Sequence, residues 1–229
     1  MNSIFIVEDH PVMRKGLAVW FAGTGRWLVT GVAENLDAAQ EAVSGMASLP
    51  DIILIDIQLK NEQSKETCAS THTDGCPSVY ADGCPSAYAD GLGLDFIPWL
   101  KKKYGKKTPA LAVYTQFDDY AHAALALSFG IQAYVCKFRS EEELEVALLA
   151  ALEGECFIDP AVQSKVQRVD TARKLLTPRE AQLLTLVKEG LSNKTIAEKL
   201  NIRVRTVENI LSCIYTKTGI SSRIDLQRM

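Results

Sequence analysis

Two short segments in which every residue is apolar constrain the fold of this chain more than any other feature. They cover residues 4–7 and residues 52–55. A strand with one face in water alternates apolar and polar residues, whereas a strand of a parallel sheet covered on both faces is apolar throughout. The two segments therefore predict buried parallel strands in an α/β sheet.

Acidic residues stand directly after both segments. Glu8 and Asp9 follow the first, and Asp56 follows the second. Open α/β sheets bind ligands at the carboxyl ends of their strands, so these side chains are expected to meet in one pocket. Three crowded carboxylates repel one another unless a cation joins them, and Mg²⁺ favours such oxygen ligands. The alternative is that each acid only caps the helix after it.

Strand-like and helix-like segments alternate as far as residue 153. The predicted strands cover residues 3–7, 28–33, 51–56, 110–114 and 133–136, and the predicted helices cover 11–22, 36–47, 92–103, 118–129 and 141–152. Five such units predict a five-stranded, doubly wound parallel sheet. Pro98 lies inside the third helix, which is therefore expected to kink or to begin later.

The remaining residues divide into a linker and a small helical module. Residues 154–171 are polar with little periodicity, which indicates a linker between domains at 1–153 and 172–229. Thr177, Pro178 and Glu180 form a capping-box pattern at the start of a helix. A second helix to about residue 200 and a third over 204–218 follow after tight turns. Short helices joined this way predict a helix-turn-helix module.

Charge is divided unevenly between the two parts. Residues 1–171 contain 14 Lys and Arg but 23 Asp and Glu, a net charge of −9, whereas residues 172–229 contain 11 and 5, a net charge of +6. A basic module on an acidic body favours nucleic-acid contact by the tail. A chance fluctuation of charge is the alternative.

The sequence shows no sign of export or of membrane insertion. No apolar stretch is long enough to span a bilayer, and the first strand begins at once, which leaves no room for a secretion signal. We expect a cytoplasmic protein that does not contact membranes, with its six cysteines outside any disulfide framework. Cys136 is expected to be a small core residue.

An irregular segment over residues 60–90 contains an eight-residue repeat, at 74–81 and again at 82–89. It could form a lid over the acidic pocket or an extra docking surface, and we favour a disordered outgrowth produced by duplication. Four of its residues could in principle hold a metal: Cys68, His72, Cys76 and Cys84. Their spacing is not that of a zinc site, which needs close Cys pairs.

Several segments in a fixed order resemble those of a known family. In the first part they are residues 6–17, 56–59, 113–115 and 133–137, and in the tail they are 176–180 and 190–197. Together they resemble a two-domain bacterial response regulator of the NarL/FixJ type. The resemblance covers all of the chain except residues 60–90. It implies a flavodoxin-like receiver domain followed by a LuxR-type helix-turn-helix domain.

The resemblance implies that Asp56 accepts a phosphoryl group from a histidine-kinase partner. Mg²⁺ would be held by Glu8, Asp9, Asp56 and the backbone carbonyl of Gln58. Because phosphoryl transfer depends mostly on positioning and charge neutralisation, a metal and a lysine around a carboxylate nucleophile are sufficient machinery. The family often has Asp where this chain has Glu8, which keeps the charge on a longer arm.

Three further residues take roles in the switch by the same resemblance. Lys137 would pair with the phosphoryl oxygens, Thr115 would hydrogen-bond them, and Tyr134 would rotate as the loop moves inward. The alternatives are a strand-end salt bridge for Lys137 and a helix cap for Thr115. Gln116, where a small residue is frequent, could hinder access to the pocket. Gly91 lies 35 positions after Asp56, where the family takes only a few.

The third helix of the tail would be the recognition helix in the major groove. Its candidate base-contacting residues are Arg205, Thr206, Glu208, Asn209 and Ser212. Candidates for phosphate contact are Lys194, Arg203 and Lys217. Residues expected in the core are Val207, Leu211 and Ile214. The family commonly has basic residues at positions 208 and 212, and its fourth helix, which supplies a dimer contact, is expected to be short here.

Three functions are consistent with these features. The first is a transcription regulator, a homodimer when active, whose DNA binding is switched by phosphorylation. The second is a regulator of the same build that works without phosphate, motivated by the insert and Gln116. The third, a metal-dependent phosphatase, needs a second acid two residues after the nucleophile, and Gln58 cannot serve as one.

Overall fold

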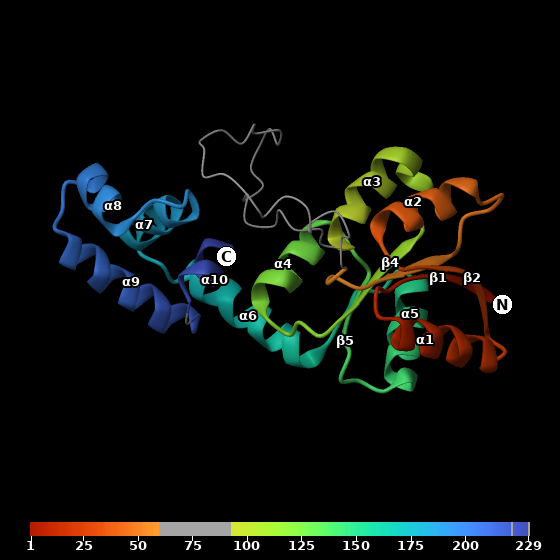
Figure 1. Cartoon of the computed structure of the whole chain (residues 1–229). Coiled ribbons are helices and arrows are strands. Elements are labelled where there is room, and N and C mark those ends of the chain that lie inside the picture. The colour runs from red at the N-terminus through yellow and green to blue at the C-terminus, as the bar shows by residue number, and fades with distance from the viewer. Residues whose placement is uncertain (60–92, 221, 229) are drawn as a thin grey trace. The chain divides into compact units, whose positions relative to one another are not determined.

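The computed structural model describes residues 1–59, 93–220 and 222–228 (Figure 1). The chain forms two compact units. The first comprises Met1–Phe117 and Ala126–Asp159, and the second comprises Asp118–Leu125 and Pro160–Met229. The insert predicted over residues 60–90, with its candidate zinc ligands, lies outside the described residues.

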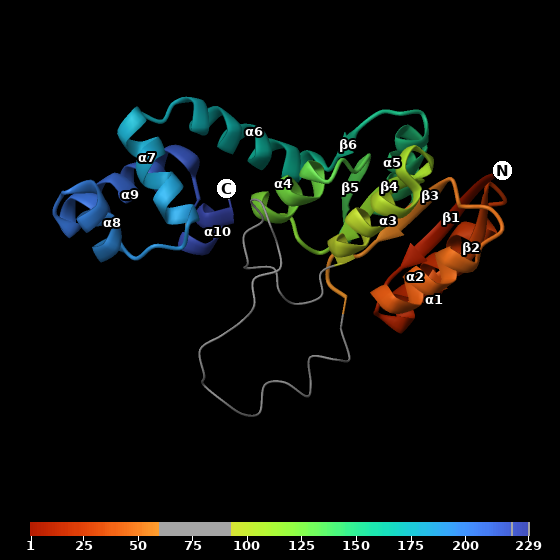
Figure 2. The ribbon, with the colours of Figure 1, turned by 90° about the horizontal axis from the view of Figure 1, so that it is seen from above.

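The first unit is built on a parallel sheet with the order β2-β1-β3-β4-β5-β6 (Figure 2). Its strands are β1 (Asn2–Val7), β2 (Trp27–Ala33), β3 (Ile52–Ile55), β4 (Ala110–Thr115), β5 (Ala133–Cys136) and β6 (Phe157–Ile158). This confirms the predicted class of fold, with one strand more than the five expected. The added strand, β6, pairs with the outer edge of β5, where Ala133 lies opposite Phe157.

Helices cover both faces of the sheet, with α1 and α5 on one side and α2 and α3 on the other (Figure 1). The helices of this unit are α1 (Pro11–Gly23), α2 (Leu36–Gly45), α3 (Phe96–Tyr104) and α5 (Glu141–Leu152), with short 3₁₀ turns η3 (Gly93–Asp95) and η4 (Gly105–Lys107). The helix α4 (Tyr120–Ser128) begins in the second unit and ends in the first. Ile4 and Ile6 pack in a core cluster with residues of α1 and α5. Phe5, which points the other way in the pleat, is equally buried. Burial on both faces explains the unbroken apolar segments.

The third helix begins later than residue 92. A 3₁₀ turn occupies Gly93–Asp95, and α3 starts at Phe96. Pro98 then lies in the first turn, where its missing N–H removes no helical hydrogen bond. The later start was one of the two outcomes expected from this proline.

The prediction of an irregular linker over residues 154–171 is wrong. This stretch contains β6 and most of α6 (Pro160–Lys174). Asp159, between them, is fully buried and accepts hydrogen bonds from Nε and Nη2 of Arg139, both at 2.9 Å. Two-residue strands leave no periodic pattern, and α6 buries only Val162, Val169 and Ala172 among many polar residues.

The second unit holds the predicted helix-turn-helix. Its further helices are α7 (Pro178–Lys188), α8 (Asn193–Leu200), α9 (Val204–Thr218) and α10 (Arg223–Arg228). Thr177 and Glu180 form the expected capping box at the start of α7. Asn201 ends α8 with a φ of 50°, a left-handed conformation that Asn tolerates better than most residues.

The core of this unit lies between α6, α7, α8 and α9. Val207, Leu211 and Ile214 are buried there, as their helical spacing predicted. Among the described residues, no helix has the length and apolar character needed to cross a membrane.

Candidate functional site

The pocket lies where the strand order reverses. The chain moves from β1 outward to β2, and then from β3 outward in the other direction to β4 and β5. At such a point the connections after two adjacent strands leave in opposite directions and open a crevice at the carboxyl ends. β1 and β3 are these adjacent strands, with Val7 opposite Ile55. Their next residues, Glu8 and Asp56, therefore stand side by side.

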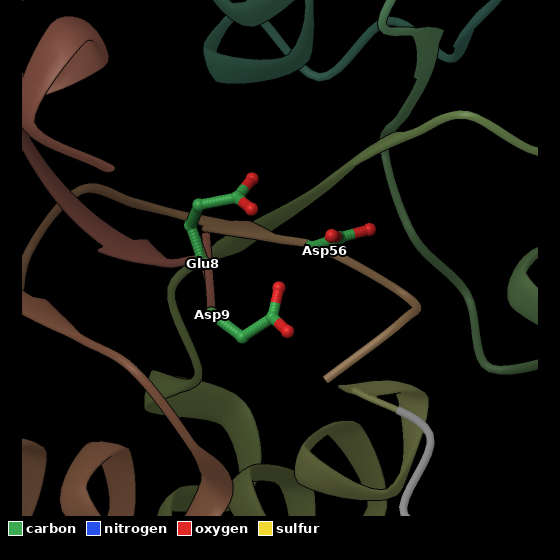
Figure 3. Close-up of side chains that lie close together, drawn as sticks. All are labelled: Glu8, Asp9 and Asp56. Atoms are coloured by element: carbon green, nitrogen blue, oxygen red, sulfur yellow. The ribbon is translucent and has the colours of Figure 1, made fainter. Parts of the chain in front are cut away.

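Three carboxylates converge in this crevice (Figure 3). Glu8, Asp9 and Asp56 each offer one oxygen, and these oxygens lie within 4.8 Å of one another. Glu8 is 2% exposed and Asp56 is 5% exposed, so water screens them poorly. The predicted convergence of the three acids is confirmed in geometry. Three oxygens at this separation fit a hard cation such as Mg²⁺.

Lys137 reaches the same crevice from the end of β5. Its Nζ donates to Oε2 of Glu8 at 2.7 Å and to Oδ2 of Asp56 at 2.8 Å. Lys137 therefore forms salt bridges with Glu8 and Asp56, as its alternative role predicted. The same contacts place it beside Asp56, the expected phosphoacceptor. The longer arm of Glu8 lets it share the ammonium group with Asp56.

The pocket holds more negative charge than Lys137 neutralises. Burial raises the pKa of Asp56 above its ordinary value, although the Lys137 hydrogen bond and charge oppose the shift. Burial likewise raises the pKa of Glu8, and the charge of Asp56 adds to that rise. Burial alone would lower the pKa of Lys137, but its bonds to both carboxylates outweigh burial and raise it. A bound cation would relieve this imbalance.

Two residues that the sequence did not single out shape the pocket. Arg14 of α1 donates from Nη1 to the backbone oxygens of Glu8, at 2.8 Å, and Asp9, at 3.2 Å. Gly93 donates from its N–H to the oxygen of Ile57 at 2.8 Å. A Cβ on Gly93 would lie 1.8 Å from the Asp56 carbonyl oxygen, so only glycine fits there. Arg14 stands within a family-like segment, but a backbone contact leaves no sequence signal of its own.

Thr115 and Tyr134 are joined through one backbone unit. The Thr115 hydroxyl accepts from the N–H of Phe117 at 3.3 Å, and the Tyr134 hydroxyl donates to the Phe117 oxygen at 2.8 Å. Both side chains are fully buried. Thr115 and Tyr134 thus hold the loop after β4 through the N–H and the oxygen of Phe117. The Thr115 bond is similar to the helix cap proposed as its alternative role.

Two glutamines lie at the outer edge of the crevice. The N–H of Gln58 donates to Oδ1 of Asp56 at 3.2 Å, and the Gln58 side chain accepts a hydrogen bond from Nε2 of Gln116. Both side chains are exposed. The sequence identified Gln116 as a bulky residue near the pocket, but it did not predict this contact.

The exposed face of α9 carries the predicted base-contacting residues. Arg205, Thr206, Glu208, Asn209 and Ser212 are all exposed. Lys194, in the first turn of α8, and Arg203, at the start of α9, are exposed as well. The structure thus places these candidates on the surface formed by α8 and α9.

Lys217, predicted as a phosphate contact, has partners within its own unit. Its Nζ donates to Oε2 of Glu180 at 2.7 Å and to the backbone oxygen of Leu175 at 3.3 Å. Glu180 also belongs to the capping box of α7, so Lys217 ties the last turn of α9 to the first turn of α7. Helical position alone could not reveal this partner, which lies 37 residues earlier in the chain.

The tail matches a family described as bacterial regulatory proteins of the luxR family, over residues 174–229. Over 98% of its length the chain is similar to transcriptional regulatory protein YdfI of Bacillus subtilis (strain 168), with 28% identity and 93% of that protein covered. It is 26% identical to oxygen regulatory protein NreC of Staphylococcus aureus (strain JH9), again over 98% of this chain and 94% of NreC.

Solved structures agree with these relatives in fold. The two-component response regulator RcsB, in its complex with DNA, superposes with a TM-score of 0.68 at 21% identity, covering 99% of this chain and 96% of RcsB. A structure of two RcsB dimers on two parallel DNAs gives a TM-score of 0.69, with the same identity and coverage. The chain is thus similar over nearly its whole length to these regulators, and its fold is that of a two-domain response regulator. The first unit has the doubly wound α/β fold, and the second carries the helix-turn-helix that matches the luxR family.

Proposed function

We propose that this chain is a response regulator switched by phosphorylation of Asp56, with a histidine kinase as the phosphodonor and Mg²⁺ as the cofactor. The observation that carries the proposal is the convergence of Glu8, Asp9, Asp56 and Lys137 on one crevice. A generic strand-end cap would need neither the half-buried lysine nor three carboxylates within 4.8 Å. A crevice of this kind does suit a phosphoryl group and a cation.

The residues divide the chemistry between them. An oxygen of Asp56 attacks the phosphorus of the donor, and the bond to the leaving group breaks. Lys137, already 2.8 Å from Asp56, is placed to neutralise charge on the transferred group. Glu8, Asp9, Asp56 and the Gln58 carbonyl would hold Mg²⁺. When bound, the ion offsets the negative charge of the carboxylates and of the incoming phosphoryl group.

The loop after β4 is the element through which the change would spread. A phosphoryl group adds a charge of about −1.5 to −2 and three strong acceptor oxygens. The Thr115 hydroxyl would turn toward those oxygens and release the N–H of Phe117. Tyr134, bonded to the oxygen of the same residue, would lose or move its contact. The two buried side chains therefore connect the pocket with the loop that leads to α4.

The DNA-binding part would place α9 in the major groove. Its exposed residues include Arg205 and Asn209, which suit guanine and adenine edges respectively. Dimers of RcsB on DNA support the proposal that two copies of this chain read two half-sites. We propose that phosphorylation favours this dimer by shifting a population of existing conformers.

The switch is tested by DNA binding of the full chain to DNA from its own gene region, with acetyl phosphate and Mg²⁺. We expect wild type to bind more tightly with the donor than without it. Asp56→Asn should show no donor effect, while Glu41→Gln, an exposed acid on α2, should behave as wild type. An equal donor effect in Asp56→Asn would contradict the proposal.

A further inference from the structure

Glu8 and Asp9 are neighbours in the sequence, yet their carboxylates enter the same crevice. Successive side chains of a strand point to opposite faces of the sheet, so two neighbouring acids do not meet while the strand continues. β1 ends at Val7, and the chain bends at Asp9. This bend lets both carboxylates turn toward Asp56 (Figure 3). The shape of the crevice therefore depends on what holds the bend.

The side chain of Arg14 bonds the bend from α1. Side chains of a helix point back toward its N-terminus, so Arg14 reaches the residues that precede the helix. Its Nη1 donates to the backbone oxygens of Glu8 and Asp9, at 2.8 and 3.2 Å, and its Nη2 donates to Oε2 of Glu34 at 3.1 Å. One guanidinium group thus fastens two successive carbonyl groups to the loop that follows β2.

The local rules of helix formation do not explain a basic residue at this position. The N-terminal turn of a helix carries a partial positive charge, which favours acidic side chains and disfavours basic ones. Arg14 is the fourth residue of α1, and its side chain is only 15% exposed, so water screens its charge weakly. Its bonds to the bend offset this cost. Residues that break a local rule are commonly found at functional sites.

We propose that Arg14 is a positioning residue, which holds the bend and thereby presents the carboxylate of Asp9 to the cation. This inference rests on the proposed function and concerns the metal site of the same pocket. Lys137 bonds the side chains of Glu8 and Asp56 directly, whereas Arg14 acts on Asp9 through the backbone. Loss of a group that orients a metal ligand typically lowers metal affinity by about 10- to 100-fold.

The charge of Arg14 and its positioning role predict opposite effects. Arg14 is a cation close to three carboxylates, so if its charge alone acted, its removal would strengthen the binding of Mg²⁺. If Arg14 holds the bend, its removal weakens the binding of Mg²⁺, because the carboxylate of Asp9 is no longer kept beside the other two. The direction of the change in affinity therefore separates the two roles.

The experiment titrates the metal-free full chain with Mg²⁺ by calorimetry, and then follows the phosphoryl adduct from acetyl phosphate by intact mass at increasing Mg²⁺ concentration. Arg14→Met keeps an unbranched side chain but removes its donors. Arg14→Lys keeps the charge but has one nitrogen for three acceptors that the arginine reaches with two. Lys15→Met, at an exposed neighbour on α1, makes the same change of charge as Arg14→Met and is the control.

We expect Arg14→Met to raise the Kd for Mg²⁺ about tenfold. The Mg²⁺ concentration that gives half of the maximal rate of adduct formation should rise by the same factor, while the rate at saturating Mg²⁺ stays near that of wild type. Arg14→Lys should also bind Mg²⁺ more weakly than wild type, and Lys15→Met should bind it as wild type does.

Unchanged or tighter Mg²⁺ binding in Arg14→Met would overturn the positioning role and leave the phosphoacceptor pocket intact. If Arg14→Met does not fold, Arg14→Lys decides alone, and a wild-type Kd in that variant would overturn the role. An equal loss of affinity in Lys15→Met would also overturn it, because the effect would not depend on the bend. A wild-type chain that binds no Mg²⁺ and forms no adduct would overturn the proposed function and this inference together.

Discussion

The Nζ of Lys137 lies 2.7 Å from Oε2 of Glu8 and bonds Asp56 at the same time. One ammonium group thus serves two buried carboxylates, while Asp9 adds a third negative charge to the crevice. In the absence of a metal the pocket is stabilised only in part. The stability of the fold, the binding of a metal and the protonation of the carboxylates are therefore linked.

Asp56→Asn should make the metal-free protein more stable at neutral pH. Burial raises the pKa of Asp56, so its protonated form favours the fold, and that contribution is lost as pH rises through the raised value. Removing the charge should raise the free energy of unfolding by roughly 1 kcal/mol, which for a protein of this size raises Tm by a few degrees. The gain should shrink as pH falls and wild-type Asp56 becomes protonated.

Thermal unfolding in EDTA measures this effect, and Glu41→Gln is the control. Adding Mg²⁺ should raise the Tm of wild type more than that of Asp56→Asn. A lower Tm for Asp56→Asn at neutral pH would show that Lys137 already balances the pocket.

Lys137→Met should destabilise the receiver domain, because it leaves two buried carboxylates without their cation. Loss of one partner from a buried pair costs about 3–5 kcal/mol. Adding Asp56→Asn to Lys137→Met should restore much of that loss, since one of the stranded charges is then removed. Urea unfolding of the four proteins in this double-mutant cycle gives the coupling. Additive effects would mean that Lys137 and Asp56 do not interact.

Asp159→Ala should lower Tm by several degrees, although the sequence placed this residue in a linker. Its buried carboxylate holds Arg139 through two bonds of 2.9 Å, and the change leaves that guanidinium with a weaker set of contacts. Glu155→Ala, four residues earlier and exposed, should leave Tm unchanged. Equal Tm values for the two variants would show that Asp159 does not stabilise the first unit.

The salt dependence of DNA binding should separate Lys217 from the exposed basic residues. Arg203→Ala and Lys194→Ala should each reduce the slope of log K against log salt by about 0.9. Lys217→Gln should leave the slope unchanged but lower the Tm of the tail, because Lys217 is paired with Glu180 inside the fold. A reduced slope for Lys217→Gln would mean that the lysine leaves Glu180 to bind DNA.

The pocket could be predicted from the sequence because it follows from strand ends. Unbroken apolar segments identified β1 and β3, and the residue after each was acidic. Pairing of these strands then forces Glu8 and Asp56 together. The place of Lys137 beside them came from the family resemblance and not from the strand pattern. Local patterns also identified the capping box at Thr177 and the buried face of α9.

Contacts between residues far apart in the sequence could not be predicted from such local patterns. The strand β6 is two residues long and exists through its pairing with β5. Arg139 and Asp159 meet across 20 residues, and Lys217 meets Glu180 across 37. Gly93 is required by a backbone carbonyl packed against it. In each case the partner is set by tertiary structure, and neither periodicity nor composition records it.

Intact mass after incubation with acetyl phosphate and Mg²⁺, compared between wild type and Asp56→Asn, tests the phosphoacceptor pocket most directly. We expect wild type to gain the mass of one phosphoryl group, EDTA to prevent the gain, and Asp56→Asn to gain nothing. An unchanged wild-type mass, or an equal gain in Asp56→Asn, would contradict this expectation.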